Sequence, residues 1–343
     1  MKTGPGDSAS PPPCRICDNE VGNRSFPATE MMLGLRDRFE YFECGRCGAL
    51  QIGRIPADLA PYYAPPYYSF QPPVNAGVVR SWLMQRLAKH ALGGRSAIGA
   101  ALARVHPAPP LIAGIGRRGL GLDARILDVG SGAGQLLVSL RDYGFRNLLG
   151  LDAFIDSDRE YDGVRIRRAS LEQLDETFDL IMFHHSFEHV PDPAQTLRDA
   201  RERLAEGGSI LIATPVASRT WREYGPDWVE LDAPRHLHVH TVTSLEFLAK
   251  ATGLVVDRVV WDSSGFELWG SEQYRRGIPL ADPASHGMGG AGKVFSAREM
   301  KQFDAQAALL NSTGQAGRAT FWLASARTVH GQARTRASED RSR

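Results

Sequence analysis

The sequence predicts an α/β fold with a mainly parallel sheet, preceded by a small metal-binding segment. From residue 125 onward, short apolar runs alternate with stretches of helical periodicity, a pattern typical of βαβ units. Ahead of this region, four cysteines stand as two identical C-x-x-C pairs within the first 47 residues. In a chain this long, that arrangement indicates metal ligands rather than a disulfide scaffold.

Length, composition and charge limit the classes of protein to consider. The 343 residues exceed the roughly 100 to 200 usual for one domain, so we expect one enzyme-sized domain and a smaller one. No stretch approaches the roughly 18 consecutive apolar residues of a membrane span. Lys+Arg 40 against Asp+Glu 39 gives a net charge of +1, which lacks the broad basic excess of most nucleic-acid-binding proteins. Nucleic acid is therefore disfavoured as a partner.

Changes in amino-acid composition along the chain predict how it divides into segments. The first residues are rich in Pro, Gly and Ser and lack the apolar stretch of a secretory signal, so we expect a cytoplasmic protein. The polar C-terminal tail is expected to be disordered. The predicted segments are 1–13 (disordered), 14–75 (cysteine segment and a Pro/Tyr-rich arm), 76–122 (helical linker), 123–330 (main α/β domain, with an insertion at about 263–315) and 331–343 (disordered tail).

The individual elements follow from periodicity and from breaking residues. Pro and Tyr are dense in residues 56–73, which favours an irregular or extended arm over a helix. Helical spacing and end signals predict helices at 78–92, 134–143, 193–204, 243–250 and 297–310. Short apolar runs predict strands at 126–129, 147–152, 164–169, 178–183, 209–214, 254–260 and 318–325.

The segment Ile126-Leu-Asp-Val-Gly-Ser-Gly-Ala-Gly134 is an apolar strand that runs into three glycines and then a helix. Glycine permits unusual backbone angles and lets a ligand approach the bare backbone. A dinucleotide fingerprint requires another glycine three positions after Gly132, where Gln135 stands instead. A pyrophosphate cofactor is therefore disfavoured. Asp152 ends the next strand, where a carboxylate can accept both hydroxyls of a ribose.

With these segments in place, the sequence resembles the class I S-adenosylmethionine-dependent methyltransferases. The resemblance rests on ILDVGSGAG, GLDAF, FDLIMFHHSFEHVPDP and LAEGGSILIATP, in this order across roughly residues 123 to 262. It implies a Rossmann-like fold with a seven-stranded, mainly parallel sheet, helices on both faces, and S-adenosylmethionine as the methyl donor.

The resemblance also implies the residues that bind this cofactor. Asp128, Gly130, Gly132 and Gly134 would surround its methionine part, and Asp152 would bind the ribose. Many relatives have an acidic residue at the adenine, and the matching position here is Ser170. The remaining residues implied to line the cofactor are Ser131, Ala153 and His184.

The cysteine pairs Cys14/Cys17 and Cys44/Cys47 have the spacing of a zinc ribbon. Each C-x-x-C turn aims two thiolates at one point, and two such turns complete the tetrahedron that Zn²⁺ prefers. We expect a structural zinc whose binding energy folds a segment too small to build its own core. Four reduced thiols without metal are the alternative.

A zinc ribbon ahead of this fold resembles two groups of enzymes. One comprises bacterial methyltransferases of nucleotide-linked sugars, and the other comprises certain ribosomal RNA guanine methyltransferases. The near-neutral charge and the sequence after the fourth strand favour the first group. The pairs Tyr62-Tyr63 and Tyr67-Tyr68 resemble tyrosines that cover the cofactor in the sugar group, with packing of the arm onto the domain as the alternative.

Two histidine clusters are candidates for the chemistry. Methyl transfer requires alignment and, for some acceptors, removal of a proton, which histidine can accept near neutral pH. His189 lies in the Glu-His-Val step after the fourth strand, either as a base or as a structural support. His236, His238 and His240 would share one face of an extended segment, a spacing also seen in metal sites. We favour His236 or His238 for acceptor binding or proton removal, with loop anchoring as the alternative.

The sequence thus predicts a methyltransferase for a small polar acceptor, such as a nucleotide-linked sugar or glycan precursor. One rival is an RNA methyltransferase whose ribbon binds RNA. The other is a non-catalytic module that binds S-adenosylmethionine and uses the ribbon for protein contacts.

Overall fold

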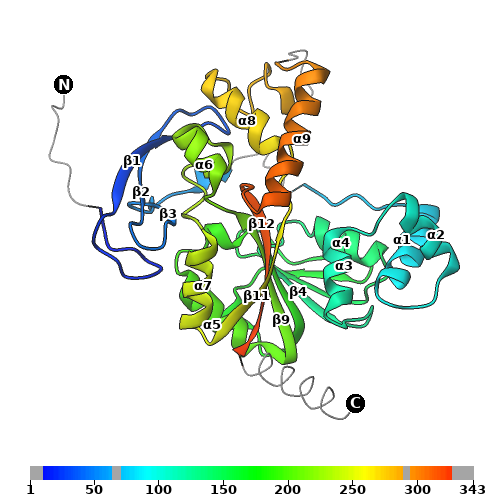
Figure 1. The fold of residues 1–343 in the computed structure, drawn as a ribbon. Helices are drawn as coiled ribbons and strands as arrows, with labels where there is room; N and C mark the ends of the chain where they lie inside the picture. Colours follow the sequence, from blue (N-terminus) through cyan, green and yellow to red (C-terminus); the bar gives the residue numbers. More distant parts are fainter. Residues whose placement is uncertain (1–10, 64–70, 289–293, 327–343) are drawn as a thin grey trace, which may run out of the picture. The chain divides into compact units, whose positions relative to one another are not determined.

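The computed structural model describes residues 11–63, 71–288 and 294–326 (Figure 1). Tyr67-Tyr68, the tail 331–343 and most of the N-terminal segment 1–13 lie outside these residues. The chain divides into two compact units. The first comprises Met1–Tyr63, Phe187–Leu197 and Ala213–Phe321, and the second comprises Ala64–Ser186, Arg198–Ile212 and Trp322–Arg343.

A large mixed sheet contains the strands that the apolar runs predict. Its order is β11-β12-β9-β8-β4-β5-β7-β6. Strand β4 pairs parallel with β5 and β8, and β5 pairs parallel with β7, whereas β6 pairs antiparallel with β7. The strands are β4 (Arg125–Val129), β5 (Asn147–Leu151), β6 (Arg159–Tyr161), β7 (Val164–Arg167), β8 (Phe178–His184), β9 (Leu204–Pro215), β11 (Leu254–Trp261) and β12 (Arg318–Ser325).

The sheet has eight strands among the described residues, so the prediction of seven was wrong by one. The additional strand is β6, whose sequence Arg-Glu-Tyr has no apolar run. It forms a hairpin with β7 through the two-residue turn Asp162-Gly163, because Tyr161 pairs with Val164. Gly163 has a φ of 77°, which glycine adopts without strain.

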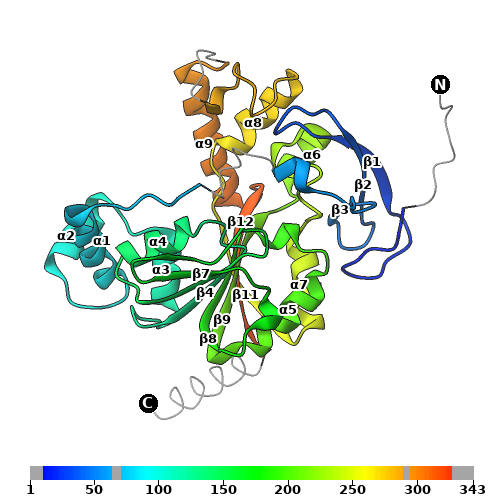
Figure 2. The same ribbon diagram turned by 180° about the vertical axis from the view of Figure 1, so that it is seen from behind.

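The helices of the second unit begin with three that precede the sheet. Helix α1 lies beside α2, and both views show the pair close to each other (Figures 1 and 2). Ser96 caps the N-terminus of α2 by accepting a hydrogen bond from the backbone N–H of Gly99 at 3.0 Å. The helices are α1 (Val78–Ala91), α2 (Ala97–Val105), α3 (Pro110–Arg117) and α4 (Gln135–Asp142).

The first unit contains a small four-stranded sheet of order β1-β2-β3-β10. The strands are β1 (Arg24–Thr29), β2 (Arg38–Glu43), β3 (Leu50–Ile52) and β10 (His238–Val239). In the chain, β10 lies almost 190 residues after β3, yet His238 pairs with Gln51 and Val239 with Leu50. The cysteine segment is therefore completed by a strand from the loop that follows β9.

The remaining helices are α5 (Pro193–Glu202), α6 (Arg219–Tyr224), α7 (Val242–Ala251), α8 (Phe266–Arg275) and α9 (Ala297–Thr313). Short 3₁₀ turns occur at Ala60–Tyr63, Leu171–Gln173, Phe187–His189, Gly225–Asp227, Val229–Leu231 and His286–Met288. Helix α8 falls within the predicted insertion but was not predicted. No helix among the described residues is long and apolar enough to cross a membrane.

The cysteine segment shares a hydrophobic core with later parts of the first unit. Tyr41 and Leu50, both fully buried, belong to one cluster with Trp221 and Trp228. Burial of aromatic side chains is among the largest apolar contributions to stability, so this shared core holds the segment in place. The prediction that the segment cannot build a core of its own is consistent with this arrangement.

Candidate active site

The glycine loop after β4 requires glycine at two positions for clear steric reasons. Gly130 has a φ of 76°, and a Cβ there would lie 2.5 Å from Cβ of Ser186. Gly134 has a φ of 87°, and its Cβ would lie 2.7 Å from Cδ1 of Ile166. Both the backbone angle and the space exclude larger residues. The loop is thus held close to its neighbours and exposes backbone rather than side chains.

Asp152, just after β5, is anchored by backbone donors. Gly132 donates its N–H to Oδ2 at 2.9 Å, and Phe154 donates its N–H to Oδ1 at 2.8 Å. Asp152 is 7% exposed. Since each carboxylate oxygen can accept more than one hydrogen bond, both retain capacity for further donors such as hydroxyls. The glycine loop and the carboxylate therefore orient each other.

Asp128, near the end of β4, is a buried acidic residue with one carboxyl oxygen that forms no hydrogen bond. Its Oδ1 atom has no hydrogen-bond partner and the residue is 3% exposed. Burial, and secondarily the charge of Asp152, raise the pKa of Asp128 to about 8. A buried carboxyl with an unpartnered oxygen is costly for a protein unless a ligand supplies a donor or a positive charge.

The other residues predicted to bind the cofactor have varied surroundings. Ser170 caps the turn Leu171–Gln173, and its backbone N–H donates to Oε1 of Gln173 at 2.8 Å. His184 is exposed and lies edge-on to His185. Ser131 is partly buried beside β5, and Ala153 is exposed. Sequence reasoning did not single out Phe154, which is 84% exposed although aromatic, and which follows Asp152 by two residues.

In the first unit, the structure brings together Glu188, His189 and His236. One ligand atom from each lies within 4.8 Å of the others. Nε2 of His236 is 3.9 Å from Oε1 of Glu188 and 3.7 Å from Oδ2 of Asp232. Oε2 of Glu188 accepts a hydrogen bond from Oγ1 of Thr214 at 3.1 Å. This group, called the Glu-His cluster below, is largely buried, with His189 the most exposed of its three members.

Hydrogen bonds define the protonation of both histidines in this cluster. Nδ1 of His236 lies 2.8 Å from the carbonyl oxygen of Glu230, and Nδ1 of His189 lies 2.8 Å from that of Arg235. A carbonyl can only accept, so each Nδ1 carries a proton. Burial lowers the pKa of His236, which favours its neutral form. In a neutral imidazole whose Nδ1 is protonated, the Nε2 atom has a lone pair.

Arg235 supports the cluster from within the core. Its guanidinium is fully buried, forms an ion pair with Asp232 and lies 3.4 Å from Oε1 of Glu30. It also donates to the carbonyl oxygen of Tyr62 at 2.9 Å. Although burial opposes the charge, Asp232 and Glu30 keep the pKa of Arg235 above its usual range. The guanidinium of Arg235 thus links three parts of the chain: the loop between β1 and β2 through Glu30, the arm through Tyr62, and the loop before β10 through Asp232.

The predicted histidine triplet does not share one environment. Strand β10 contains only residues 238 and 239, so the extended geometry does not reach His236. His236 belongs to the Glu-His cluster. The fully buried rings of His238 and His240 instead stack on each other, with 6.0 Å between their centroids. Nε2 of His238 accepts a hydrogen bond from Nε of Arg15 at 3.1 Å. The condition for a face shared by all three histidines, an extended segment that reaches His236, is therefore not met.

The arm contacts the cluster through Tyr63, whose hydroxyl lies 3.2 Å from Nδ1 of His189. Tyr62 instead donates its hydroxyl to Oδ2 of Asp37 at 2.9 Å and packs edge-on against Phe39. Within the first unit, the Tyr62-Tyr63 pair thus packs onto neighbouring side chains.

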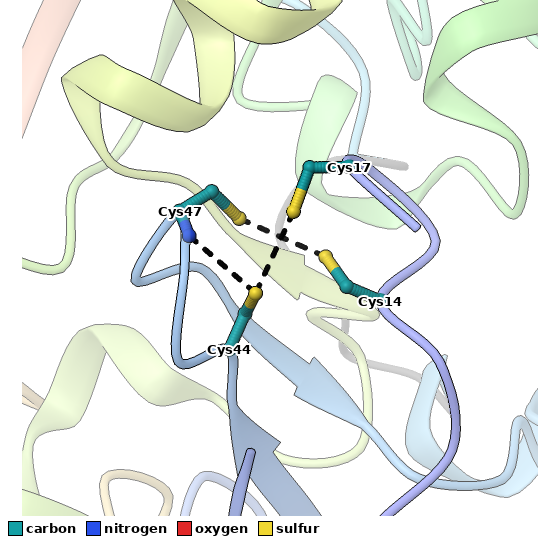
Figure 3. A group of neighbouring side chains, drawn as sticks. All are labelled: Cys14, Cys17, Cys44 and Cys47. Carbon is teal, nitrogen blue, oxygen red and sulfur yellow. Dashed lines mark hydrogen bonds between the residues drawn. The ribbon is translucent and has the colours of Figure 1, made fainter. Parts of the chain in front are cut away.

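The four cysteines converge on one point, with all sulfur atoms directed inward (Figure 3). The Sγ atoms are 3.7 Å apart for Cys14 and Cys47 and 3.6 Å apart for Cys17 and Cys44. With Zn–S bonds of about 2.3 Å, a tetrahedral zinc site has sulfur separations of roughly 3.8 Å. Nε2 of Gln51 donates to Sγ of Cys14 at 2.9 Å, which would stabilise a thiolate.

Comparison with known proteins identifies the central region. Residues 96–259 match a family model described as a methyltransferase domain. Together with the mixed Rossmann-like sheet, this match confirms the predicted fold of this region and the prediction of an enzyme.

A curated relative is the ubiquinone biosynthesis O-methyltransferase of Paramagnetospirillum magneticum, which is 38% identical over 99 residues. The match covers 26% of this chain and 39% of the relative, so the chain spans well under half of that protein.

Solved structures with detectable similarity include a mycolic acid cyclopropane synthase bound to SAH (19% identity, TM-score 0.38, covering 61% of this chain and 80% of that chain). Another is an S-adenosylmethionine-dependent methyltransferase from Mesorhizobium loti (18% identity, TM-score 0.36, covering 59% and 90%).

Proposed function

Residues 96–259 match a family model described as a methyltransferase domain, and on this premise we propose that the protein transfers a methyl group from S-adenosylmethionine to a small polar acceptor. The acceptor we propose is a hydroxyl-bearing nucleotide-linked sugar or glycan precursor. The observation that carries the proposal is the pair of carboxyl groups of Asp128 and Asp152 around a loop that only glycine can form.

The donor site fits the chemistry of S-adenosylmethionine. Asp152 retains acceptor capacity for ribose hydroxyls, and the unpartnered Oδ1 of Asp128 suits the positively charged amino-acid end of the ligand. Gly130, Gly132 and Gly134 let a ligand approach the backbone, with Ser131 beside them, and we propose that the exposed ring of Phe154 stacks on the base. Ala153, Ser170 and His184 complete the proposed lining. When bound, S-adenosylmethionine supplies a methyl group activated by its sulfonium.

The acceptor site we propose is the Glu-His cluster. Glu188 and His189 follow β8 closely in the chain, where the class I fold places residues near the methyl group. The Nε2 lone pairs of His189 and His236 can accept a hydrogen bond from an acceptor hydroxyl, and Glu188 and Asp232 stabilise positive charge beside them. His238 is fully buried against Arg15, so we assign it to the support of β10 rather than to the acceptor.

The curated relative supports oxygen as the acceptor atom, because its name describes an O-methyltransferase. In oxygen methylation the acceptor O–H bond breaks, a carbon–oxygen bond forms, and the methyl–sulfur bond of the donor breaks to leave S-adenosylhomocysteine. The released proton must pass to a base or to water.

The cysteine site we propose binds one structural Zn²⁺ through Cys14, Cys17, Cys44 and Cys47. The sulfur separations and the four thiol donors support this proposal, and four protein ligands leave no open position for catalysis.

Defined acceptors test the proposal. Purified protein with S-adenosylmethionine is incubated with nucleotide-linked sugars, a catechol and transfer RNA, and products are measured by mass spectrometry. A gain of one methyl group on a nucleotide-linked sugar is the expected result. Methylation of the catechol alone would replace the proposed acceptor class, and methylation of the RNA alone would favour an RNA methyltransferase.

A further inference from the structure

We propose that Glu188, His189 and His236 form a second metal site, which binds a divalent first-row transition ion. This site is distinct in composition from the cysteine site, since it offers two imidazoles and a carboxylate. Its ligand atoms lie within 4.8 Å of one another, with 3.9 Å between Nε2 of His236 and Oε1 of Glu188. Ligands bound at about 2.1 Å in a tetrahedral site are roughly 3.4 Å apart, so small side-chain shifts would close the site.

The hydrogen bonds of both histidines match those of metal ligands. A histidine that binds metal through one ring nitrogen usually donates the other N–H to a carbonyl or a carboxylate, which fixes the tautomer and the ring orientation. Here, Nδ1 of His236 donates to the carbonyl of Glu230, and Nδ1 of His189 donates to that of Arg235. Both Nε2 atoms are thus available as ligands from rings that the backbone already orients.

The carboxylate is held in the same way. Oε2 of Glu188 accepts from Thr214 at 3.1 Å, which leaves Oε1 directed toward His236. The backbone of Glu188 is also bound to the loop that contains His236, because the N–H of Leu237 donates to the carbonyl of Glu188 at 2.9 Å. Glu188 is 1% exposed, so its carboxylate is held in a buried position beside His236.

Charge around the site also favours a cation. Oδ2 of Asp232 lies 3.7 Å from Nε2 of His236 and can serve as a further ligand or as an outer partner. Among these residues, Asp232 and Glu30 share the guanidinium of Arg235, and the carboxylate of Glu188 lies beside the imidazole of His236, so carboxylates outnumber guanidinium groups. A divalent ion would balance the excess of negative charge.

The ligand set indicates the class of metal and its use. Two histidines and one carboxylate bind first-row transition ions and leave coordination positions open. With the Nε2 lone pairs bound to the ion, an open position on the ion takes an oxygen of the acceptor, which replaces the direct hydrogen bonds from the acceptor hydroxyl to the histidines. This use rests on the proposed function, whereas binding of the metal does not.

The experiment titrates Co²⁺ into protein whose cysteine site is loaded with zinc, with calorimetry and visible absorption as readouts. Cobalt on nitrogen and oxygen ligands gives weak visible bands, whereas cobalt on thiolates gives intense near-ultraviolet charge-transfer bands, so displacement of zinc is recognised. The variants are Glu188→Gln, which can still accept from Thr214, and His189→Gln, which lies at the more exposed position. His106→Gln, which alters an exposed histidine at the end of α2, is the matched control.

We expect one equivalent of Co²⁺ without charge-transfer bands, at least a roughly tenfold weaker affinity in both cluster variants, and unchanged affinity in the control. Circular dichroism shows whether each variant is folded, and either folded variant suffices. No binding beyond the zinc site, or equal affinity in a folded cluster variant, would overturn the proposal. Titration of S-adenosylmethionine into the same preparation tests the proposed function separately, since absence of cofactor binding would count against that function and not against the metal site.

Discussion

The backbone N–H of Gly132 donates to the carboxylate of Asp152 at 2.9 Å, so the glycine loop and the acidic end of β5 form one unit of structure. A substitution at either position therefore alters the other. The same carboxylate accepts from Phe154, and its charge contributes to the raised pKa of Asp128.

Replacing Asp152 with Asn should weaken binding of S-adenosylmethionine about 10- to 100-fold. A hydrogen bond to a charged group contributes about 1.5–3 kcal/mol, and Asn both removes the charge and directs a donor toward backbone N–H groups. Calorimetric titration measures the effect, with Asp175→Asn at an exposed position as the control. An unchanged affinity in Asp152→Asn would remove this residue from the cofactor site.

Asp128 should make stability fall as pH rises toward 8. The unfolded chain loses this proton near pH 4, but the folded chain keeps it until about pH 8, because burial raises the pKa of Asp128. Between these values the folded state binds more protons, so the free energy of unfolding decreases with pH. The contribution of protonated Asp128 to the free energy of unfolding is fully present below pH 4 and is lost as the pH rises through 8.

We expect this residue to account for a loss of about 2 kcal/mol between pH 6 and pH 8, at about 1.4 kcal/mol per pH unit. Urea denaturation at pH 6, 7 and 8 measures it in wild type and in Asp128→Asn, which is neutral throughout. The loss should be smaller by this amount in the variant. Parallel pH profiles for the two proteins would show that Asp128 ionises normally.

Arg235 should be essential for the stability of the first unit. Removing one member of a buried ion pair typically costs about 3–5 kcal/mol, because the partner remains buried and charged. Arg235→Met leaves Asp232 and Glu30 without their cation, so a decrease of this size in the free energy of unfolding is expected. Arg24→Met is the control and should cost less than about 1 kcal/mol, because Arg24 is mostly exposed and its partner Glu43 keeps an ion pair with Arg222.

Loss of zinc should destabilise the first unit without abolishing cofactor binding. Arg15, between two of the cysteines, donates to His238 of β10 and to the carbonyl of Ile52, so disorder of the cysteine turns should spread to β10. We expect Cys44→Ser to lose one zinc per chain by native mass spectrometry and to lower the melting temperature. Its affinity for S-adenosylmethionine should change less than about threefold, a 0.7 kcal/mol effect. Full retention of zinc by this variant would contradict the four-cysteine site.

Much of the sheet was predictable because its strands are buried. The runs around Leu127 and Ile181 are apolar on both faces, which is typical of central parallel strands. Strand β6 was missed because its pattern is polar, although the Asp162-Gly163 dipeptide is a strong hairpin signal. Helix α8 was missed because its buried positions include the polar residues Glu267, Ser271 and Gln273.

The histidine environments could not be predicted from spacing alone. Alternation placed His236 with His238 and His240, but its actual neighbours Glu188 and His189 lie more than 45 residues earlier in the chain. Likewise, one of the two carboxylates that pair with Arg235 belongs to Glu30, 205 residues away. Such contacts depend on how the loop before β10 packs against the cysteine segment, which no local pattern encodes.

The most direct test of methyl transfer uses S-adenosylmethionine with a labelled methyl group. The purified protein is incubated with this donor and a cell extract that is then separated into small-molecule, RNA and protein fractions, with Asp152→Asn as the control. We expect label in the small-molecule fraction with wild type and at least a roughly tenfold lower yield with the variant at a subsaturating donor concentration, in line with its lost affinity. Label that remained on the donor in every fraction, despite measured cofactor binding, would contradict the account.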